Sequence, residues 1–96
     1  FAYFLDKLKS TKDGDGTLLD HSSFLYGSGM GDPDVHNHVN LPILIAGGPA
    51  KQKGALVIRN TEPAPLANVH LTLLEKAGVH QDSFADSTGR VSELLA

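Results

Sequence analysis

The sequence contains no cysteine and no tryptophan, and its 96 residues include only two tyrosines and four phenylalanines. Without cysteine the chain can form no disulfide, no thiolate nucleophile and no cysteine-ligated zinc site. No apolar run approaches the ~18 residues that a bilayer-spanning helix requires, so no membrane span is expected. The longest run, residues 41–46, contains a proline and has the length of a buried strand. Any chemistry must therefore come from carboxylate, imidazole, hydroxyl and amine groups.

Positive charge is also scarce in this chain. Eleven Asp and Glu outnumber eight Lys and Arg, which gives a formal net charge of −3, and the basic residues form no stripe. Binding to nucleic acid or to an anionic membrane surface is therefore disfavoured. The chain begins with Phe1, and no basic segment followed by an apolar stretch marks a signal peptide. We expect the natural start of the protein to lie upstream.

The hydrophobic pattern predicts helices and strands in alternation, which is the α/β class. Helices are expected over 2–10, over 65–77 between Pro65 and Gly78, and in a last short turn near Val91. Strands are expected over 23–26, 41–46 and 55–59. Residues 41–46 are apolar on both faces, as in a sheet that helices cover on each side.

Two such strands need more sheet and more helices than 96 residues supply. We therefore interpret residues 1–96 as a single partial domain, the C-terminal fragment of a larger α/β domain whose N-terminal part is missing. Strand edges left open in such a piece are expected to pair with another copy of the chain, which predicts a homo-oligomer.

The acidic turn at residues 11–18 imitates the first half of an EF-hand loop, with alternating aspartates followed by glycine. The imitation fails at both ends, because Thr11 takes the first ligand position and Ser22 takes the place of the bidentate glutamate. Two carboxylates there would attract calcium only weakly. A plain acidic turn is the prediction.

Residues 27–31 are a glycine-rich segment after a predicted strand. Their spacing is neither the dinucleotide fingerprint nor a P-loop, and Tyr26 and Met30 occupy the positions where a nucleophile elbow around Ser28 requires glycine. The prediction is a tight turn in which the glycines allow positive φ or a close approach of two backbones.

The next segment carries the residues best suited to hold a metal ion. Because side chains in an extended chain alternate with a period of two, all four would point to one side: Asp32, Asp34, His36 and His38. Two imidazoles and two carboxylates suit a divalent ion such as zinc, manganese or iron. The alternative is a polar surface loop held by ordinary hydrogen bonds. Pro33 and Asn37 favour irregular backbone, which would break the alternation.

The whole chain resembles the C-terminal end of a bacterial family catalogued as domain of unknown function fifteen-fifty-two. The resemblance lies in four strings that occur in order: 13–21, 26–31, 36–48 and 65–74. Members of that family look like exported proteins, so the resemblance implies a periplasmic or secreted location.

A more distant resemblance is to the alkaline-phosphatase-like superfamily of phosphatases, sulfatases and phosphoglycerate mutases. Residues 24–28 resemble its strand before an Asp-His-Gly metal motif, and His38 before the strand 41–45 resembles its later histidine ligand. This implies a three-layer α/β/α sandwich, with about three strands and two to three helices present here. Gly29, Met30 and Gly31 stand where that motif is expected, so two ligands are missing.

The resemblance implies a parent protein related to metal-dependent phosphate and sulfate ester hydrolases. Its nucleophile and remaining ligands would come from upstream regions, so this chain is not expected to be catalytic alone. The alternative is a non-catalytic binding or structural module without a metal.

Overall fold

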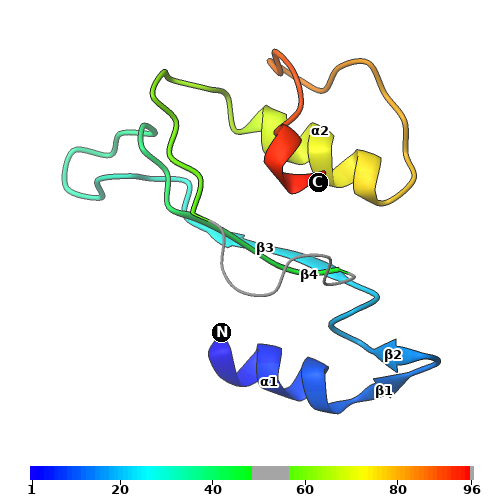
Figure 1. Cartoon of the computed structure of the whole chain (residues 1–96). Coiled ribbons are helices and arrows are strands. Elements are labelled where there is room, and N and C mark those ends of the chain that lie inside the picture. The colour runs from blue at the N-terminus through cyan, green and yellow to red at the C-terminus, as the bar shows by residue number, and fades with distance from the viewer. Residues whose placement is uncertain (49–56, 96) are drawn as a thin grey trace. The chain divides into compact units, whose positions relative to one another are not determined.

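A computed structural model describes residues 1–48 and 57–95. The chain divides into two compact units, Phe1–Ala50 and Lys51–Ala96, and Figure 1 shows the elements of each. The described residues form two α-helices, one 3-10 helix and two small two-stranded sheets. Helix and strand are thus mixed, as expected, whereas the three-layer sandwich stays a prediction. No helix in the described ranges is long and apolar enough to cross a membrane.

The first unit begins with helix α1, Ala2–Ser10, as the helical spacing predicted. The helix ends where Ser10 and Thr11 turn their hydroxyls back onto the carbonyl of Lys7, and Thr11 takes extended backbone. The acidic turn then forms a short antiparallel hairpin of β1 (Lys12–Asp13) and β2 (Gly16–Thr17). Gly14 has φ of 59° at its tip, a conformation that glycine adopts without strain.

The second sheet pairs β3, Ser23–Gly27, with β4, Ile43–Gly47, in antiparallel register. Both predicted strands are confirmed, and Pro42 lies just before β4, where no ladder donor is required. Side chains two apart on β3 share one face, and that face meets the aromatic residues of α1. Phe24 lies edge-on to Phe4, with ring centroids 5.2 Å apart, and Tyr26 stacks on Phe1 at 4.5 Å.

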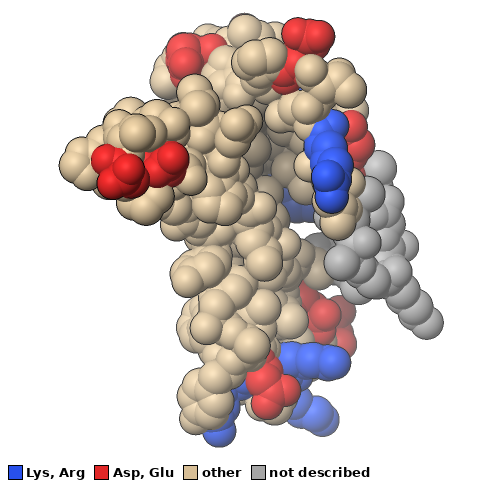
Figure 2. Space-filling model, turned by 90° about the vertical axis from the view of Figure 1, so that its left-hand side faces the viewer, with Lys and Arg blue, Asp and Glu red and all other residues tan. Residues whose placement is uncertain are grey.

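The side chains of the first unit are only partly shielded from solvent. Of the apolar side chains in the described ranges, the buried ones are Ala67 and Leu71, and both belong to the second unit. On the sheet of the first unit, Tyr26 is 57% exposed and Leu44 is 47% exposed. Figure 2 shows that most of the visible surface is uncharged, with acidic and basic side chains in small separate groups. Sheet surface that would be covered in a larger α/β domain is therefore open here.

The second unit is built on helix α2, Ala67–Lys76, which follows Pro65 and is succeeded by Gly78 with φ of 81°. The predicted helix and its glycine stop are both confirmed. The hydroxyl of the buried Thr72 donates to the carbonyl of Asn68 at 2.6 Å and accepts the Val91 amide at 2.8 Å. The hydrogen bond from the Val91 amide ties the chain's last segment to α2. The expected short terminal helix is present as the 3-10 helix Ser92–Leu94.

The strand predicted over 55–59 is not formed where the structure can be described. Residues 55 and 56 lie outside the described residues, and 57–59 have irregular backbone. Val57 is 73% exposed. An apolar segment becomes a strand only when a neighbouring strand satisfies its backbone, and local composition does not supply that neighbour. The prediction is therefore wrong for residues 57–59.

Candidate functional site

The loop between β3 and β4, residues 28–42, carries all four predicted metal ligands. It is a closed turn. Asp32 bridges to Asn37, the Gly31 amide donates to the Asn37 carbonyl at 3.1 Å, and the Asn37 amide donates to the Asp32 carbonyl at 3.3 Å. His36 has φ of 53° at the turn. The extended chain with one-sided alternation is therefore wrong, because turning residues replace strand backbone between Asp32 and Asn37.

The two aspartates of this loop differ in their roles. One carboxylate oxygen of Asp32 accepts the backbone amides of Asp34 at 2.9 Å and Val35 at 3.5 Å, an arrangement that stabilises the turn after Pro33. Asp34 and His36 are exposed. Across residues 1–48 and 57–95, no three His, Asp or Glu side chains are grouped so that they could hold one metal ion. Any site that uses this loop therefore needs ligands from elsewhere.

His38 is the histidine whose ring orientation is held by the loop itself. Its Nδ1 hydrogen-bonds the carbonyl of Gly29. A carbonyl only accepts, so Nδ1 carries the proton, and Nε2 of the neutral ring keeps its lone pair. Proteins orient metal-binding histidines in this way, with the second ring nitrogen donating to a carbonyl or carboxylate. The geometry therefore suits His38 to act as an Nε2 ligand.

Beside His38 in the sequence, Asn37 presents an unusual buried acceptor. Its side-chain oxygen is buried and finds no hydrogen-bond partner in the part of the chain that the structure describes. Leaving such a group unsatisfied costs about 1–3 kcal/mol. A bound cation or water would satisfy it. The loop thus carries an oriented imidazole, a partly engaged carboxylate and an amide oxygen, each of a type that divalent metals bind.

Close backbone approach explains two glycines of the segment 27–31, Gly27 and Gly31. A Cβ on Gly31 would lie 1.8 Å from the carbonyl oxygen of Val39, and one on Gly27 would lie 2.6 Å from that of Pro42. The hydroxyl of Ser28 accepts the Met30 amide at 3.1 Å, so it serves the turn. The predicted close approach of two backbones is confirmed at Gly27 and Gly31, whereas positive φ is not found at these glycines and the backbone turn lies further on, at residues 33–36.

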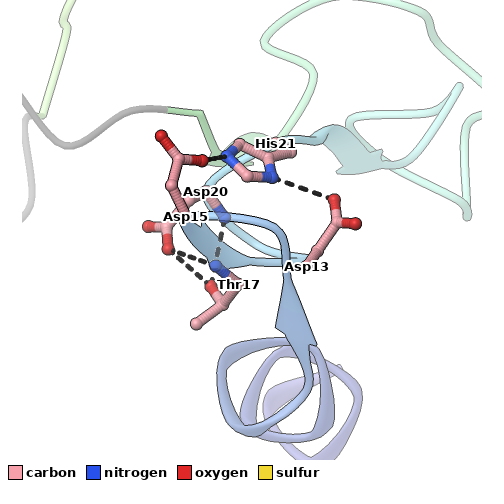
Figure 3. A network of polar contacts seen from close by, with 5 residues as sticks. All are labelled: Asp13, Asp15, Thr17, Asp20 and His21. Atoms are coloured by element: carbon pink, nitrogen blue, oxygen red, sulfur yellow. Dashed lines mark hydrogen bonds and ion pairs between the residues drawn. The ribbon is translucent and has the colours of Figure 1, made fainter.

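A second polar cluster, which no motif in the sequence indicated, surrounds His21 and is drawn in Figure 3. His21 Nδ1 lies 2.9 Å from a carboxylate oxygen of Asp13, and Nε2 lies 3.1 Å from one of Asp15. The hydrogen bond to Asp13 raises the pKa of His21, with further support from the charges of Asp13, Asp15 and Asp20 and opposition from burial. The hairpin folds these residues together, and sequence spacing alone does not show this.

Asp20 belongs to the same cluster but has different partners. One of its carboxylate oxygens accepts the Thr17 hydroxyl at 2.7 Å and the Thr17 amide at 2.8 Å. These two bonds lower the pKa of Asp20, because they favour the ionised carboxylate. Asp20 therefore stabilises the turn that leads from β2 toward β3.

The remaining two histidines lie in the second unit. His70 is half-buried and edge-on to Phe84 at 5.9 Å, and the two line a small apolar pocket with Leu73 and Leu74. His80 is exposed, with Nδ1 2.8 Å from a carboxylate oxygen of Glu75. Neither arrangement resembles a ligand set.

Comparison of the chain with protein-family models, with curated proteins and with solved structures found no match.

Proposed function

We propose that residues 1–96 are the C-terminal part of an exported α/β protein related to metal-dependent phosphate and sulfate ester hydrolases. In this proposal His38 supplies one ligand to a divalent metal ion. The observation that carries it is the hydrogen bond between His38 Nδ1 and the Gly29 carbonyl, which leaves Nε2 as the coordinating nitrogen.

The loop would hold and orient one ligand, and the parent protein would supply the rest. A divalent ion such as zinc, manganese or iron supplies Lewis acidity toward a phosphoryl or sulfuryl oxygen when bound. Within this chain, Gly29 and Asp32 maintain the loop conformation, and His38 presents its ring. The nucleophile and the other ligands belong to upstream polypeptide in this proposal, so the chain alone is not catalytic.

The thin cover of the first unit supports the fragment part of the proposal. A lone two-stranded sheet is marginal in water, and further strands or a covering helix normally stabilise it. Here α1 meets one face of the β3–β4 sheet, yet Tyr26 and Leu44 on that face remain about half exposed. Additional sheet and helices from the parent would bury this surface.

A titration with Mn²⁺ tests the His38 assignment, because paramagnetic broadening detects even weak binding. In NMR spectra of the 96-residue chain, we expect Mn²⁺ to broaden the imidazole signals of His38 ahead of those of His80. His38→Ala should remove the broadening of loop 28–42, whereas His80→Ala, in the second unit, should leave it unchanged. Equal broadening of the loop in wild type and His38→Ala would reject His38 as a ligand.

A binding or structural module without metal is the second candidate. It is favoured by the loop's own hydrogen bonds, since Asp32 turns a carboxylate oxygen onto two backbone amides. In that case Mn²⁺ would broaden residues 28–42 no more than other segments with exposed carboxylates, and His38→Ala would leave that broadening unchanged.

We also propose that the chain self-associates through an edge of the β3–β4 sheet. The Ser28 amide donates to the Pro42 carbonyl, so residues 28 and 42 form a hydrogen-bonded pair at the end of the antiparallel sheet. Hydrogen-bonded and non-hydrogen-bonded pairs alternate along an antiparallel sheet. Leu25 and Ile45 face each other in a non-hydrogen-bonded pair, so their backbone N–H and C=O groups point outward at the two edges. No charged residue occurs in 22–31 or 39–48, so neither edge carries the charges that usually prevent strand pairing.

A further inference from the structure

His21 is held between two carboxylates of the β1–β2 hairpin. It lies in the turn after β2, whereas Asp13 ends β1 and Asp15 lies in the tip next to Gly14. Both ring nitrogens are within hydrogen-bond distance of a carboxylate oxygen, at 2.9 Å for Asp13 and 3.1 Å for Asp15 (Figure 3). The cluster therefore closes the hairpin tip onto the segment that leads to β3.

The protonation state of the ring decides whether both contacts can be hydrogen bonds. An ionised carboxylate only accepts, and a neutral imidazole has one N–H and one lone pair. Only the imidazolium form donates from both nitrogens. We propose that the hairpin is a proton-gated clamp, in which protonated His21 bridges Asp13 and Asp15, and loss of the proton releases Asp15 and loosens the tip.

When the ring loses its proton, the contact that breaks is the one between His21 and Asp15, for two geometric reasons. Its contact with the ring is the longer one, and its side chain is 96% exposed against 49% for Asp13. The neutral ring therefore keeps its proton on Nδ1, toward Asp13, and turns a lone pair toward Asp15. Three carboxylates face His21, and the third, Asp20, is already engaged by the hydroxyl and amide of Thr17. Asp20 thus adds charge near the ring without competing for its protons.

The direction of the effect follows from the raised pKa of His21. In the unfolded chain the imidazole titrates near ~6.5. A group whose pKa is higher in the folded state stabilises that state fully below the unfolded pKa. The contribution is lost as the pH rises through the folded pKa. The clamp is therefore closed below the unfolded pKa and opens as the pH rises through the higher folded pKa.

An NMR pH titration of the whole 96-residue chain tests the clamp. In wild type we expect the His21 imidazole to titrate above ~6.5, and the amide signals of Gly14 and Asp15 to shift with the same midpoint. Asp13→Asn should lower the His21 pKa more than Asp15→Asn, because Asp13 provides the stronger hydrogen bond. Asp82→Asn, in the second unit, is the matched control and should leave the His21 pKa unchanged.

Three results would overturn the clamp. The first is a wild-type His21 that titrates at or below ~6.5. The second is an equal His21 pKa in wild type, Asp13→Asn and Asp15→Asn. The third is a set of tip amides that do not follow the His21 titration. His21→Gln guards against general unfolding, because the titration step of His21 should disappear from the tip amides while the signals of β3 and α2 stay in place.

Discussion

Replacing Gly31 by alanine should open the loop that carries His38. The new Cβ would lie 1.8 Å from the Val39 carbonyl oxygen, and Cβ atoms essentially never come closer than 3.0 Å to such an atom. Relief requires a movement of 3.0 − 1.8 = 1.2 Å. Because the Gly31 amide already lies 3.1 Å from the Asn37 carbonyl, a movement of that size breaks their hydrogen bond. We expect a cost of about 1–3 kcal/mol, the usual penalty for overpacking.

Amide hydrogen exchange at Asn37 measures this cost directly, since its N–H donates across the same turn. A loss of about 1–3 kcal/mol corresponds to roughly 5- to 150-fold faster exchange. Gly29→Ala is the matched control, because a Cβ there meets nothing within 4 Å and its φ is not positive. Equal Asn37 exchange rates in the two variants would refute the close approach of the Gly31 and Val39 backbones.

Three further outcomes are expected. Thr72→Val should destabilise the second unit by about 1–3 kcal/mol, because the Val91 amide loses its buried acceptor, and unchanged thermal unfolding would contradict this. The pKa of Asp20 is lowered, so its stabilisation is present above the ordinary pKa and is lost as the pH falls through the folded value. The Thr17 amide should therefore shift in acid in wild type but not in Asp20→Asn. Ile45→Pro should abolish concentration-dependent self-association in light scattering while circular dichroism keeps the sheet signal, and a wild type that is monomeric at every concentration would argue against edge pairing.

The helices are the part of the fold that local sequence determines. Residues 2–10 and 67–76 carry helical apolar spacing, and the stop at Gly78 needs only one left-handed residue. Hydrogen bonds in a helix close within four residues, so neighbours along the chain decide whether it forms. The strands β3 and β4 coincide with short apolar runs that the sequence marks, but they form because each satisfies the backbone of the other.

Pairing and loop closure could not be read from the sequence. An apolar run does not reveal its partner strand, and for this reason the prediction over 55–59 is wrong at 57–59, while β3 and β4 find each other in antiparallel register. The alternation of the candidate ligands presumed extended backbone. A left-handed His36 and the bridge from Asp32 to Asn37 replaced it with a turn.

Residue types and their order alone determined which chemistry this chain can offer, namely imidazole and carboxylate without thiol, and placed the candidate ligands on a loop between two strands. Tertiary structure decided which of those groups meet. It set His38 against the Gly29 carbonyl and brought His21 between Asp13 and Asp15. The physical reason is distance along the chain: these contacts join residues six to nine positions apart through turns, and a turn's path depends on the backbone contacts around it.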